Sequence, residues 1–391
     1  MQTKIKRRKF GDTGLYVSEV ALGAMNLRML DTVEQAFEMV NYALDQGINL
    51  IDTARAYNGV NGEGVMVESE DIVSRVLASR TDIDEPIVIV TKGHGYTPET
   101  FDEDLDISLN KLRIRKTEKG LFIGSVEVKL VYFYHGIMRE RWETMKSSGA
   151  IDQGKRRQAA GDLTYLGFSA HYGDGDVIKE AIDTGAFQVT ELPYNLYNRV
   201  LSEDGEIDLF RYAAEHGMGI VNMKAFNGTA NLATSRILGD MVSITYSDML
   251  RFCLGNPYVS AIDAGARWPR ELEQDINDSL LPPLTKEERA ALAAEADKVS
   301  GLFSNICREC THCMEKFQCP RGIYIPSVLG AYARVNIAEA VGRDTEPYRK
   351  AYAALEGPLA DACVACGQCK PWCEYHLDIP ALMTEAKEKL G

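Results

Sequence analysis

The stretch IVIVTKGHGYTPETFDEDLDISLNKL, residues 87–112, joins a short apolar run to a helical pattern. Its first residues, Ile87–Val90, form an uninterrupted β-branched run, which is typical of a strand buried on both faces of a parallel sheet. After Pro98 the apolar residues recur every three or four positions, as on a helix that packs against a sheet. The stretch therefore predicts one β/α unit of a parallel α/β fold.

The same unit recurs along the chain, and eight apolar runs alternate with helical patterns between residues 16 and 265. Such alternation indicates parallel strands joined by right-handed crossovers, and eight units close a barrel. We therefore expect an α/β protein with a (β/α)₈ TIM barrel. The expected strands are Val17–Gly23, Ile48–Thr53, Ile87–Lys92, Lys129–His135, Tyr165–Ser169, Val189–Tyr194, Gly219–Ala225 and Val259–Gly265.

Three segments depart from this rhythm. Segments 113–128 and 151–163 lack sustained periodicity and are rich in Gly, Lys, Arg or Gln, so we expect polar insertions at barrel loops. The stretch LLPPLT, residues 280–285, marks a domain seam, and its last residue is suited to cap a helix over Lys286–Val299. We expect two domains, a barrel over residues 1–284 and a small α-helical domain over residues 285–391.

Composition limits the partners of this chain. Its 391 residues carry a formal net charge of −14, which repels nucleic-acid phosphates and anionic membrane surfaces. The basic run from Lys4 to Lys9 has no interleaved aromatic residue, and we interpret it as a solvated strand. No apolar run approaches the roughly 20 residues that span a bilayer. We expect a cytoplasmic protein with no nucleic-acid or membrane partner.

Polar residues end several of the expected strands. Asp52, Lys92 and His135 each end an apolar run, and Tyr57 follows Asp52 closely. The carboxyl ends of barrel strands meet on one face, where chemistry is carried out. A nearby ammonium lowers the pKa of a tyrosine from about 10, so a Lys92 held by Asp52 would make Tyr57 a general acid. His135 would then orient a carbonyl oxygen. Alternatively, Asp52 and Lys92 form a structural ion pair.

Three motifs carry a family resemblance. The stretches RKFGDTGLYVS (8–18), IDTARAY (51–57) and YLGFS (165–169) resemble the aldo-keto reductase family, and the similarity covers most of residues 7–278. The resemblance implies an oxidoreductase that uses NADPH or NADH to reduce a small carbonyl compound, or to oxidise the alcohol. It also implies a catalytic tetrad of Asp52, Tyr57, Lys92 and His135, in which the tyrosine donates the proton.

The resemblance extends to the nucleotide contacts with some departures. Glu191 stands where many members have glutamine for the carboxamide, and Met223 stands where they stack an aromatic ring. Asp275 stands where asparagine is usual. A cation is suited to bind nucleotide phosphates, which favours Lys224 and Arg267 as phosphate contacts. The implied NAD(P)-binding residues are Ser169, Glu191, Met223, Lys224 and Arg267.

Eight of the nine cysteines are crowded into two motifs, which favours metal or cluster ligation over disulfides. Bacterial two-cluster ferredoxins place three close cysteines on one cluster and the distant fourth on the other. Structural zinc is the alternative, but it needs no third close cysteine. We expect Cys253 to be a buried apolar residue. The expected ligands of two 4Fe-4S clusters are Cys307, Cys310, Cys313 and Cys373 for one, and Cys363, Cys366, Cys369 and Cys319 for the other.

This cysteine segment resembles the ferredoxin-like dicluster module at the C-terminus of a bacterial and archaeal branch of the aldo-keto reductases. The resemblance implies an iron-sulfur domain and allows a ferredoxin-type redox partner. A second hypothesis remains open, in which the barrel is a degenerate scaffold and the protein is chiefly an electron-transfer module. Nucleotide binding and loss of activity in Tyr57→Phe separate the two hypotheses.

Overall fold

The computed structural model describes residues 5–227, 237, 243–303, 305–309, 313–314, 317–373 and 375–390. The chain divides into two compact units. The barrel unit lies within Met1–Tyr194, Arg199–Ala225 and Leu250–Pro283. The cysteine unit lies within Asn195–Asn198, Phe226–Met249 and Leu284–Gly391. None of the helices among the described residues combines the length and apolar character needed to cross a membrane.

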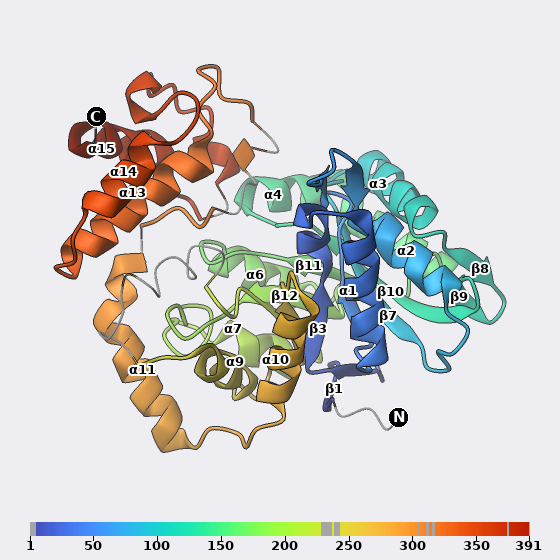
Figure 1. Ribbon diagram of the computed structural model, residues 1–391. Helices are drawn as coiled ribbons and strands as arrows, with labels where there is room; N and C mark the ends of the chain where they lie inside the picture. The colour runs from blue at the N-terminus through green and yellow to red at the C-terminus, as the bar shows by residue number, and fades with distance from the viewer. Residues whose placement is uncertain are drawn as a thin grey trace. The chain divides into compact units, whose positions relative to one another are not determined.

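The barrel unit contains a closed ring of eight parallel strands, as the alternation predicted (Figure 1). Neighbouring strands pair in parallel, and β11 closes the ring by pairing with β10. The TIM-barrel prediction is therefore confirmed. The strands are β3 (Val20–Gly23), β4 (Leu50–Asp52), β7 (Ile87–Gly93), β10 (Val126–Tyr134), β11 (Tyr165–Ser169), β12 (Val189–Pro193), β13 (Gly219–Met223) and β14 (Ala261–Ala264).

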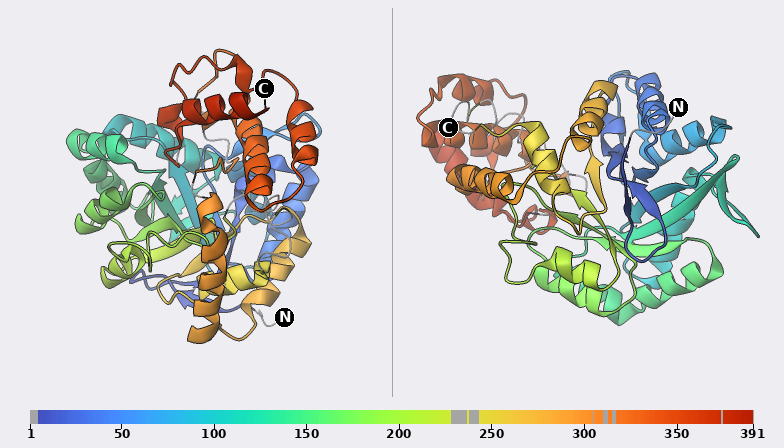
Figure 2. Two further views of the ribbon diagram at one scale, coloured as in Figure 1. Left: turned by 90° about the vertical axis from the view of Figure 1, so that its left-hand side faces the viewer. Right: turned by 90° about the horizontal axis from the view of Figure 1, so that it is seen from below.

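Helices follow the strands and lie outside the ring (Figure 2). In α3 the periodic residues Phe101 and Leu105 are buried, and Thr97 caps the helix by accepting a hydrogen bond from the Thr100 N–H. An apolar stripe and a capped start thus fix α3 against the sheet. The helices are α1 (Val33–Asp45), α2 (Ser69–Ser79), α3 (Pro98–Lys111), α4 (Arg139–Ser148), α5 (Ala150–Ala160), α6 (Gly175–Asp183), α7 (Leu209–Glu215), α9 (Tyr246–Leu254) and α10 (Pro269–Ser279).

A hairpin covers the amino ends of the strands. The antiparallel strands β1 (Arg7–Lys9) and β2 (Tyr16–Ser18) bring Phe10, which is fully buried, against core residues such as Val88 and Val131. The predicted strand Val17–Gly23 is therefore two strands, because the chain bends at Glu19 between the hairpin and the barrel.

Two predictions about insertions were wrong. Segment 113–128 forms strands β8 (Arg115–Thr117) and β9 (Gly120–Ile123), which pair antiparallel and extend the sheet along β10. Leu121 and Ile123 are buried in alternation, which is the period-2 signal of a strand. Segment 151–163 is largely α5, which buries only small residues such as Gly154, so its sequence has no apolar stripe.

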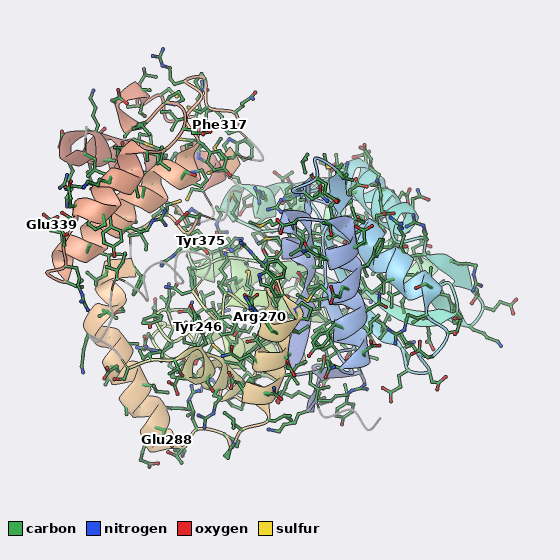
Figure 3. The ribbon with its side chains drawn as sticks, viewed as in Figure 1. Tyr246, Arg270, Glu288, Phe317, Glu339 and Tyr375 are labelled. Atoms are coloured by element: carbon green, nitrogen blue, oxygen red, sulfur yellow. The ribbon has the colours of Figure 1, made fainter. Side chains whose placement is uncertain are left out.

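The elements that the structure describes in the segment that begins at Leu284 are helices, joined by turns and irregular stretches. The predicted helix over 286–299 is present as α11 (Lys286–Ser300), and Thr285 caps it. A small apolar core holds Ile325, Leu329, Leu382 and Met383. Phe317, which is labelled in Figure 3, packs against this core. The other elements are η3 (Gly301–Phe303), α13 (Ile325–Ala340), α14 (Glu346–Ala353), η4 (Ala360–Ala362), η5 (Lys370–Trp372) and α15 (Ile379–Leu390).

Candidate active site

The four predicted catalytic residues lie at the carboxyl end of the barrel. Asp52 is the last residue of β4, Lys92 is the penultimate residue of β7, and His135 directly follows β10. Tyr57 lies in the loop after β4. These three strands are direct neighbours in the ring, so all four side chains converge, and all four are buried.

Lys92 is the centre of this arrangement. Its Nζ donates to both carboxylate oxygens of Asp52 and lies 3.2 Å from the Tyr57 Oη. The ring of Tyr57 meets the ring of His135 edge to face, with centroids 5.9 Å apart. The phenol therefore contacts the ammonium on one side and an imidazole on another.

Two further carboxylates share the same ammonium. Glu191 on β12 places its Oε2 3.4 Å from the Lys92 Nζ. Carboxylate oxygens of Asp52, Glu191 and Asp263 all lie within 4.8 Å of one another. Asp263, on β14, was not predicted, because only residues at strand ends were collected. Its signal was an acid in the middle of a buried strand.

This charge arrangement changes the expected acidity. Burial raises the pKa of Tyr57 well above its usual range; Lys92 lowers it, but the three carboxylates raise it further. The predicted fall toward neutrality is therefore absent. Burial by itself lowers the pKa of Lys92, but Asp52 and Glu191 reverse this and leave it well above its usual value. Both groups thus hold their protons at neutral pH.

The crowded acids of this site have raised pKa values. Burial, with repulsion from Glu191, raises the pKa of Asp263 to about 7. The same causes raise the pKa of Asp52, against the attraction of Lys92. One ammonium faces three carboxyl groups, so the site carries a surplus of negative charge when they ionise.

Residues just beyond β7 add to the site. The imidazole of His94 stacks on that of His135, with centroids 4.5 Å apart and an interplanar angle of 29°. The Tyr96 hydroxyl donates to the backbone carbonyl of His135. Neither residue was predicted, although both follow a strand end. They hold His135 in place and widen the polar surface of the site.

The residues predicted to bind NAD(P) follow the ends of neighbouring strands. The buried Ser169 ends β11, and its Oγ accepts a hydrogen bond from the Gly136 N–H at 2.9 Å. Met223 ends β13 and is buried, and Lys224 follows it. The Lys224 Nζ lies 2.8 Å from the Nδ1 of His171, a buried residue.

Two other predicted positions lie beyond β14. Arg267 is partly exposed, and its backbone N–H donates to Glu271 at 2.8 Å. Asp275 lies on α10, where burial, with repulsion from Asp278, raises its pKa to about 7. Arg267 thus belongs to the same barrel end as Glu191 and Met223, whereas Asp275 lies on an outer helix.

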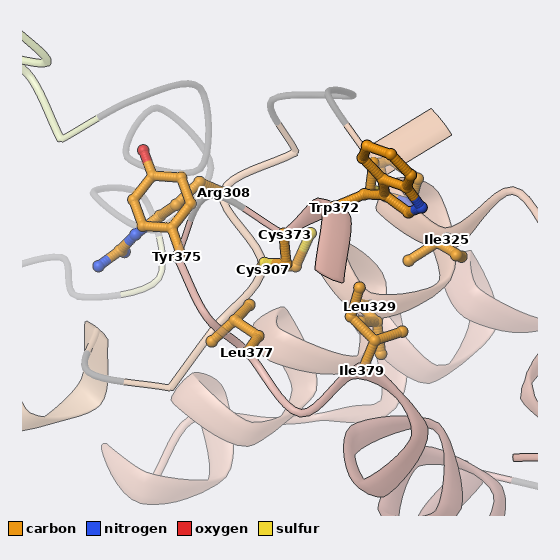
Figure 4. A pocket seen from close by; sticks show the side chains of 11 residues that line it. Cys307, Arg308, Ile325, Leu329, Trp372, Cys373, Tyr375, Leu377 and Ile379 are labelled. Atoms are coloured by element: carbon orange, nitrogen blue, oxygen red, sulfur yellow. The ribbon is translucent and has the colours of Figure 1, made fainter. Parts of the chain in front are cut away.

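The cysteines of the cysteine unit line two pockets. Cys307, Cys313 and Cys373 line one pocket, and in Figure 4 Cys307 and Cys373 lie side by side. Cys310 lies outside the described residues. The second pocket holds the other set, in which burial, with repulsion from its neighbours, raises the pKa of Cys369 to about 11. Its cysteines are Cys319, Cys363, Cys366 and Cys369.

The two cysteine motifs share local backbone geometry. Two residues after the first cysteine of each motif, Glu309 and Ala365 adopt positive φ angles of 54° and 51°. Their N–H groups donate to the Sγ atoms of Cys307 and Cys363, both at 3.4 Å. A positive φ is uncommon for these residue types, so the same turn at both places marks a repeated loop that points N–H groups at sulfur.

The first pocket also contains a buried cation. Arg308 donates to the Phe303 carbonyl at 2.6 Å and lies over the ring of Tyr375, 5.7 Å from its centroid. Apolar residues such as Leu329 and Ile379 complete this pocket (Figure 4). Each pocket is therefore a thiol-lined hollow within an apolar core.

Residues 19–245 match the sequence model of the aldo/keto reductase family. An uncharacterized oxidoreductase, YrpG of Bacillus subtilis, is 25% identical over 222 residues, which are 54% of this chain and 63% of that protein. The 6-dehydroglucose reductase of Novosphingobium aromaticivorans is 34% identical over 100 residues, 25% of this chain and 33% of that protein. The chain thus spans less than two thirds of the length of either relative.

Solved structures share the fold. The aldo-keto reductase AKR11C1 from Bacillus halodurans matches in its holo form with a TM-score of 0.59 at 20% identity, covering 74% of this chain and 96% of that chain. Its apo form matches with a TM-score of 0.56 at 21% identity and the same coverage. This likeness concerns the barrel architecture. The chain belongs to the aldo/keto reductase family.

Proposed function

We propose that this protein uses NADPH or NADH to reduce a small carbonyl compound, or uses the oxidised nucleotide to oxidise the corresponding alcohol. The observation that carries the proposal is the contact of 3.2 Å between Lys92 Nζ and Tyr57 Oη, made while Asp52 holds the ammonium. A structural ion pair alone does not require a phenol at the ammonium.

The chain's own residues supply the proton chemistry. A bound nicotinamide supplies or accepts the hydride. Tyr57 holds its proton in the resting site and donates it to the carbonyl oxygen as charge develops there. After the transfer Lys92 faces the phenolate of Tyr57. Each pKa unit by which Lys92 lowers the pKa of Tyr57 corresponds to about 1.4 kcal/mol of phenolate stabilisation. His135, held by His94 and Tyr96, orients the same oxygen.

The nucleotide is proposed to lie along the ends of β11 to β14, against Ser169, Glu191, Met223, Lys224 and Arg267. The chemistry of these residues fits, because Lys224 and Arg267 are cations suited to phosphate oxygens. Glu191 and Asp263 bear on the direction of reaction. The oxidised nicotinamide ring is a cation and the reduced ring is neutral, so surplus carboxylates favour the oxidised form. Stabilisation of the bound oxidised ring favours hydride transfer from the reduced nucleotide to the carbonyl.

We also propose that the cysteine unit binds two 4Fe-4S clusters. The support is the crossed arrangement, in which Cys373 lines the pocket of the first triple and Cys319 lines the pocket of the second. N–H groups that point at Cys307 and Cys363 fit the hydrogen bonds that cluster sulfurs accept. Zinc fits less well, because the second pocket presents a third close cysteine. Such thiol ligands fit a reducing compartment such as the cytoplasm.

The role of these clusters is structural or electron-transferring. The side chain of Val364, beside the second pocket, is 59% exposed, and Cys366 is exposed as well. An exposed ligand and an apolar neighbour favour electron exchange with a ferredoxin-type partner. The alternative function, an electron-transfer protein on a degenerate barrel, draws on this exposure, but it leaves the assembled tetrad without a role.

Titration of the anaerobically purified protein with NADPH and NADH tests the proposal. Nucleotide fluorescence reports binding, and visible absorbance reports the clusters. Tight binding with unchanged absorbance supports a reductase with structural clusters, and binding with bleaching supports electron flow between nicotinamide and clusters. Absence of binding by either nucleotide would overturn the oxidoreductase site and leave the electron-transfer protein.

A further inference from the structure

A cavity of about 650 Å³ lies in the barrel unit, apart from the catalytic residues. Four cations, Lys6, Arg7, Arg8 and Arg251, line it together with the carboxylate of Glu19. Its volume is in the range of small-molecule sites, about 300–1,000 Å³. The cavity is therefore large enough for a metabolite.

The cavity lies at the opposite end of the barrel from Tyr57 and Lys92. Glu19 directly precedes β3, and Arg251 lies on α9, which leads into the amino end of β14. The catalytic residues follow the carboxyl ends of their strands. A ligand in this cavity would thus be separate from the nucleotide and the substrate.

The cations of the cavity are only partly neutralised. Arg7 pairs with Glu85, and Arg8 pairs with Glu19 at 2.9 Å. Lys6 donates to the Ser279 carbonyl at 2.8 Å, and Arg251 donates to the Pro282 carbonyl at 2.7 Å. Within the described parts of the chain neither Lys6 nor Arg251 has a carboxylate partner. A chain of net charge −14 thus concentrates unneutralised positive charge in one cavity.

Two residues that line the cavity, Glu19 and Arg251, each have a buried polar atom that lacks a hydrogen-bond partner among the described residues. Glu19 is only 2% exposed, and its Oε1 accepts no hydrogen bond while Oε2 is held by Arg8. The Nε of Arg251 is buried and donates to no acceptor. Lys6 is accounted for by the negative end of α10, where Ser279 lies. Helix capping does not account for Glu19 or Arg251.

We propose that this cavity binds a phosphate ester that also carries a hydroxyl or amino group, of the size of a nucleoside monophosphate. The phosphate would accept hydrogen bonds from Lys6 and Arg251, for which charged donors are suited. The hydroxyl or amino group would donate to the Glu19 Oε1. The nucleobase of a nucleoside monophosphate would pack on Leu254 and Leu281, which also line the cavity. The proposal is independent of the function proposed for the tetrad.

Calorimetric titration of the full chain with AMP tests this site, with inorganic phosphate and adenosine as partial probes. AMP is expected to bind more tightly than either partial probe. Lys6→Gln and Arg251→Gln are each expected to weaken AMP binding at least tenfold. Lys9→Gln is the matched control, because Lys9 lies on β1, which directly follows Lys6, and it is exposed and pairs with Asp12 instead. It is expected to leave the affinity unchanged.

Further variants separate this cavity from the barrel mouth. Arg267→Gln removes a cation at the proposed nucleotide site and is expected to leave AMP binding in the cavity intact. Loss of AMP binding in Arg267→Gln, with normal binding in Arg251→Gln, would overturn the proposal. So would the absence of any AMP binding, or phosphate binding as tightly as AMP. Thermal melting of each variant, compared with the parent, keeps misfolding distinct from lost binding.

Discussion

The carboxyl end of the barrel and the cysteine unit bring their reactive side chains together in opposite ways. The barrel site draws Asp52, Lys92, Glu191 and Asp263 from four different strands and crowds charged groups into one buried place. The cysteine unit draws its thiols from two short motifs into apolar pockets. A site assembled across strands depends on barrel closure, whereas a site assembled within motifs is encoded by spacing.

The largest effect is expected when the proposed proton donor of the barrel site is removed. Tyr57→Phe should lower kcat by about 10²- to 10⁴-fold, because general acid catalysis contributes that much. Nucleotide affinity and iron content should not change. Tyr165→Phe is the control, because its hydroxyl donates to the Thr13 carbonyl in the amino-terminal hairpin instead. Steady-state kinetics with a panel of aldehydes measure both; undiminished kcat in Tyr57→Phe would remove the tyrosine from the mechanism.

The cysteine unit is tested by iron analysis of double variants. Cys319→Ser should remove about half of the bound iron, because one of the two proposed clusters loses a ligand. Adding Cys369→Ser should remove no more, since both residues line the second pocket. Adding Cys307→Ser instead should remove nearly all the iron. If the last pair loses only half, the crossed assignment of the fourth cysteines is wrong. Cys253→Ser, outside both pockets, should retain all the iron.

A smaller effect is expected from the surplus charge of the barrel site. Glu191→Gln removes a carboxylate 3.4 Å from Lys92 and leaves its shape. The preference for binding oxidised over reduced nucleotide should fall on the order of tenfold, since the cationic oxidised nicotinamide ring loses one nearby negative charge. Equilibrium dialysis with NADP⁺ and NADPH measures the ratio. Glu127→Gln, which removes an acid paired with Lys129, should leave the ratio unchanged, and an unchanged ratio in Glu191→Gln would refute the charge argument.

The smallest effect concerns an acid buried outside both sites. Burial raises the folded-state pKa of Asp275 to about 7, from its usual value of 3.8. This group therefore does not lower the free energy of unfolding below pH 4. It lowers that free energy increasingly between pH 4 and 7, and by the full amount above pH 7. Asp275→Asn should add about 1–2 kcal/mol of stability at pH 8 and almost none at pH 4, less than the whole shift implies because the side chain is partly exposed. Urea unfolding at both pH values measures this, and an equal gain at both would point to packing rather than ionisation.

Much of the barrel was readable from local patterns. Continuous apolar runs such as Ile87–Val90 predicted buried parallel strands, and polar residues at their ends predicted Asp52, Lys92 and His135 as neighbours. The rule failed where the pattern was weak. The alternation at Leu121 and Ile123 was too short to be recognised, and α5 packs through small residues that leave no stripe.

The sequence by itself determined the eight β/α units and the strand ends at which Asp52, Lys92 and His135 lie, because these follow from the period of the apolar runs. The crossed grouping of the cysteines stays a prediction from their spacing. Only the tertiary structure decided that Asp263 joins Glu191 at Lys92, that His94 stacks on His135, and that a basic cavity forms around Glu19. These contacts join residues that no short-range pattern relates. They form because closing the ring of strands brings residues that are far apart in the sequence close together in space.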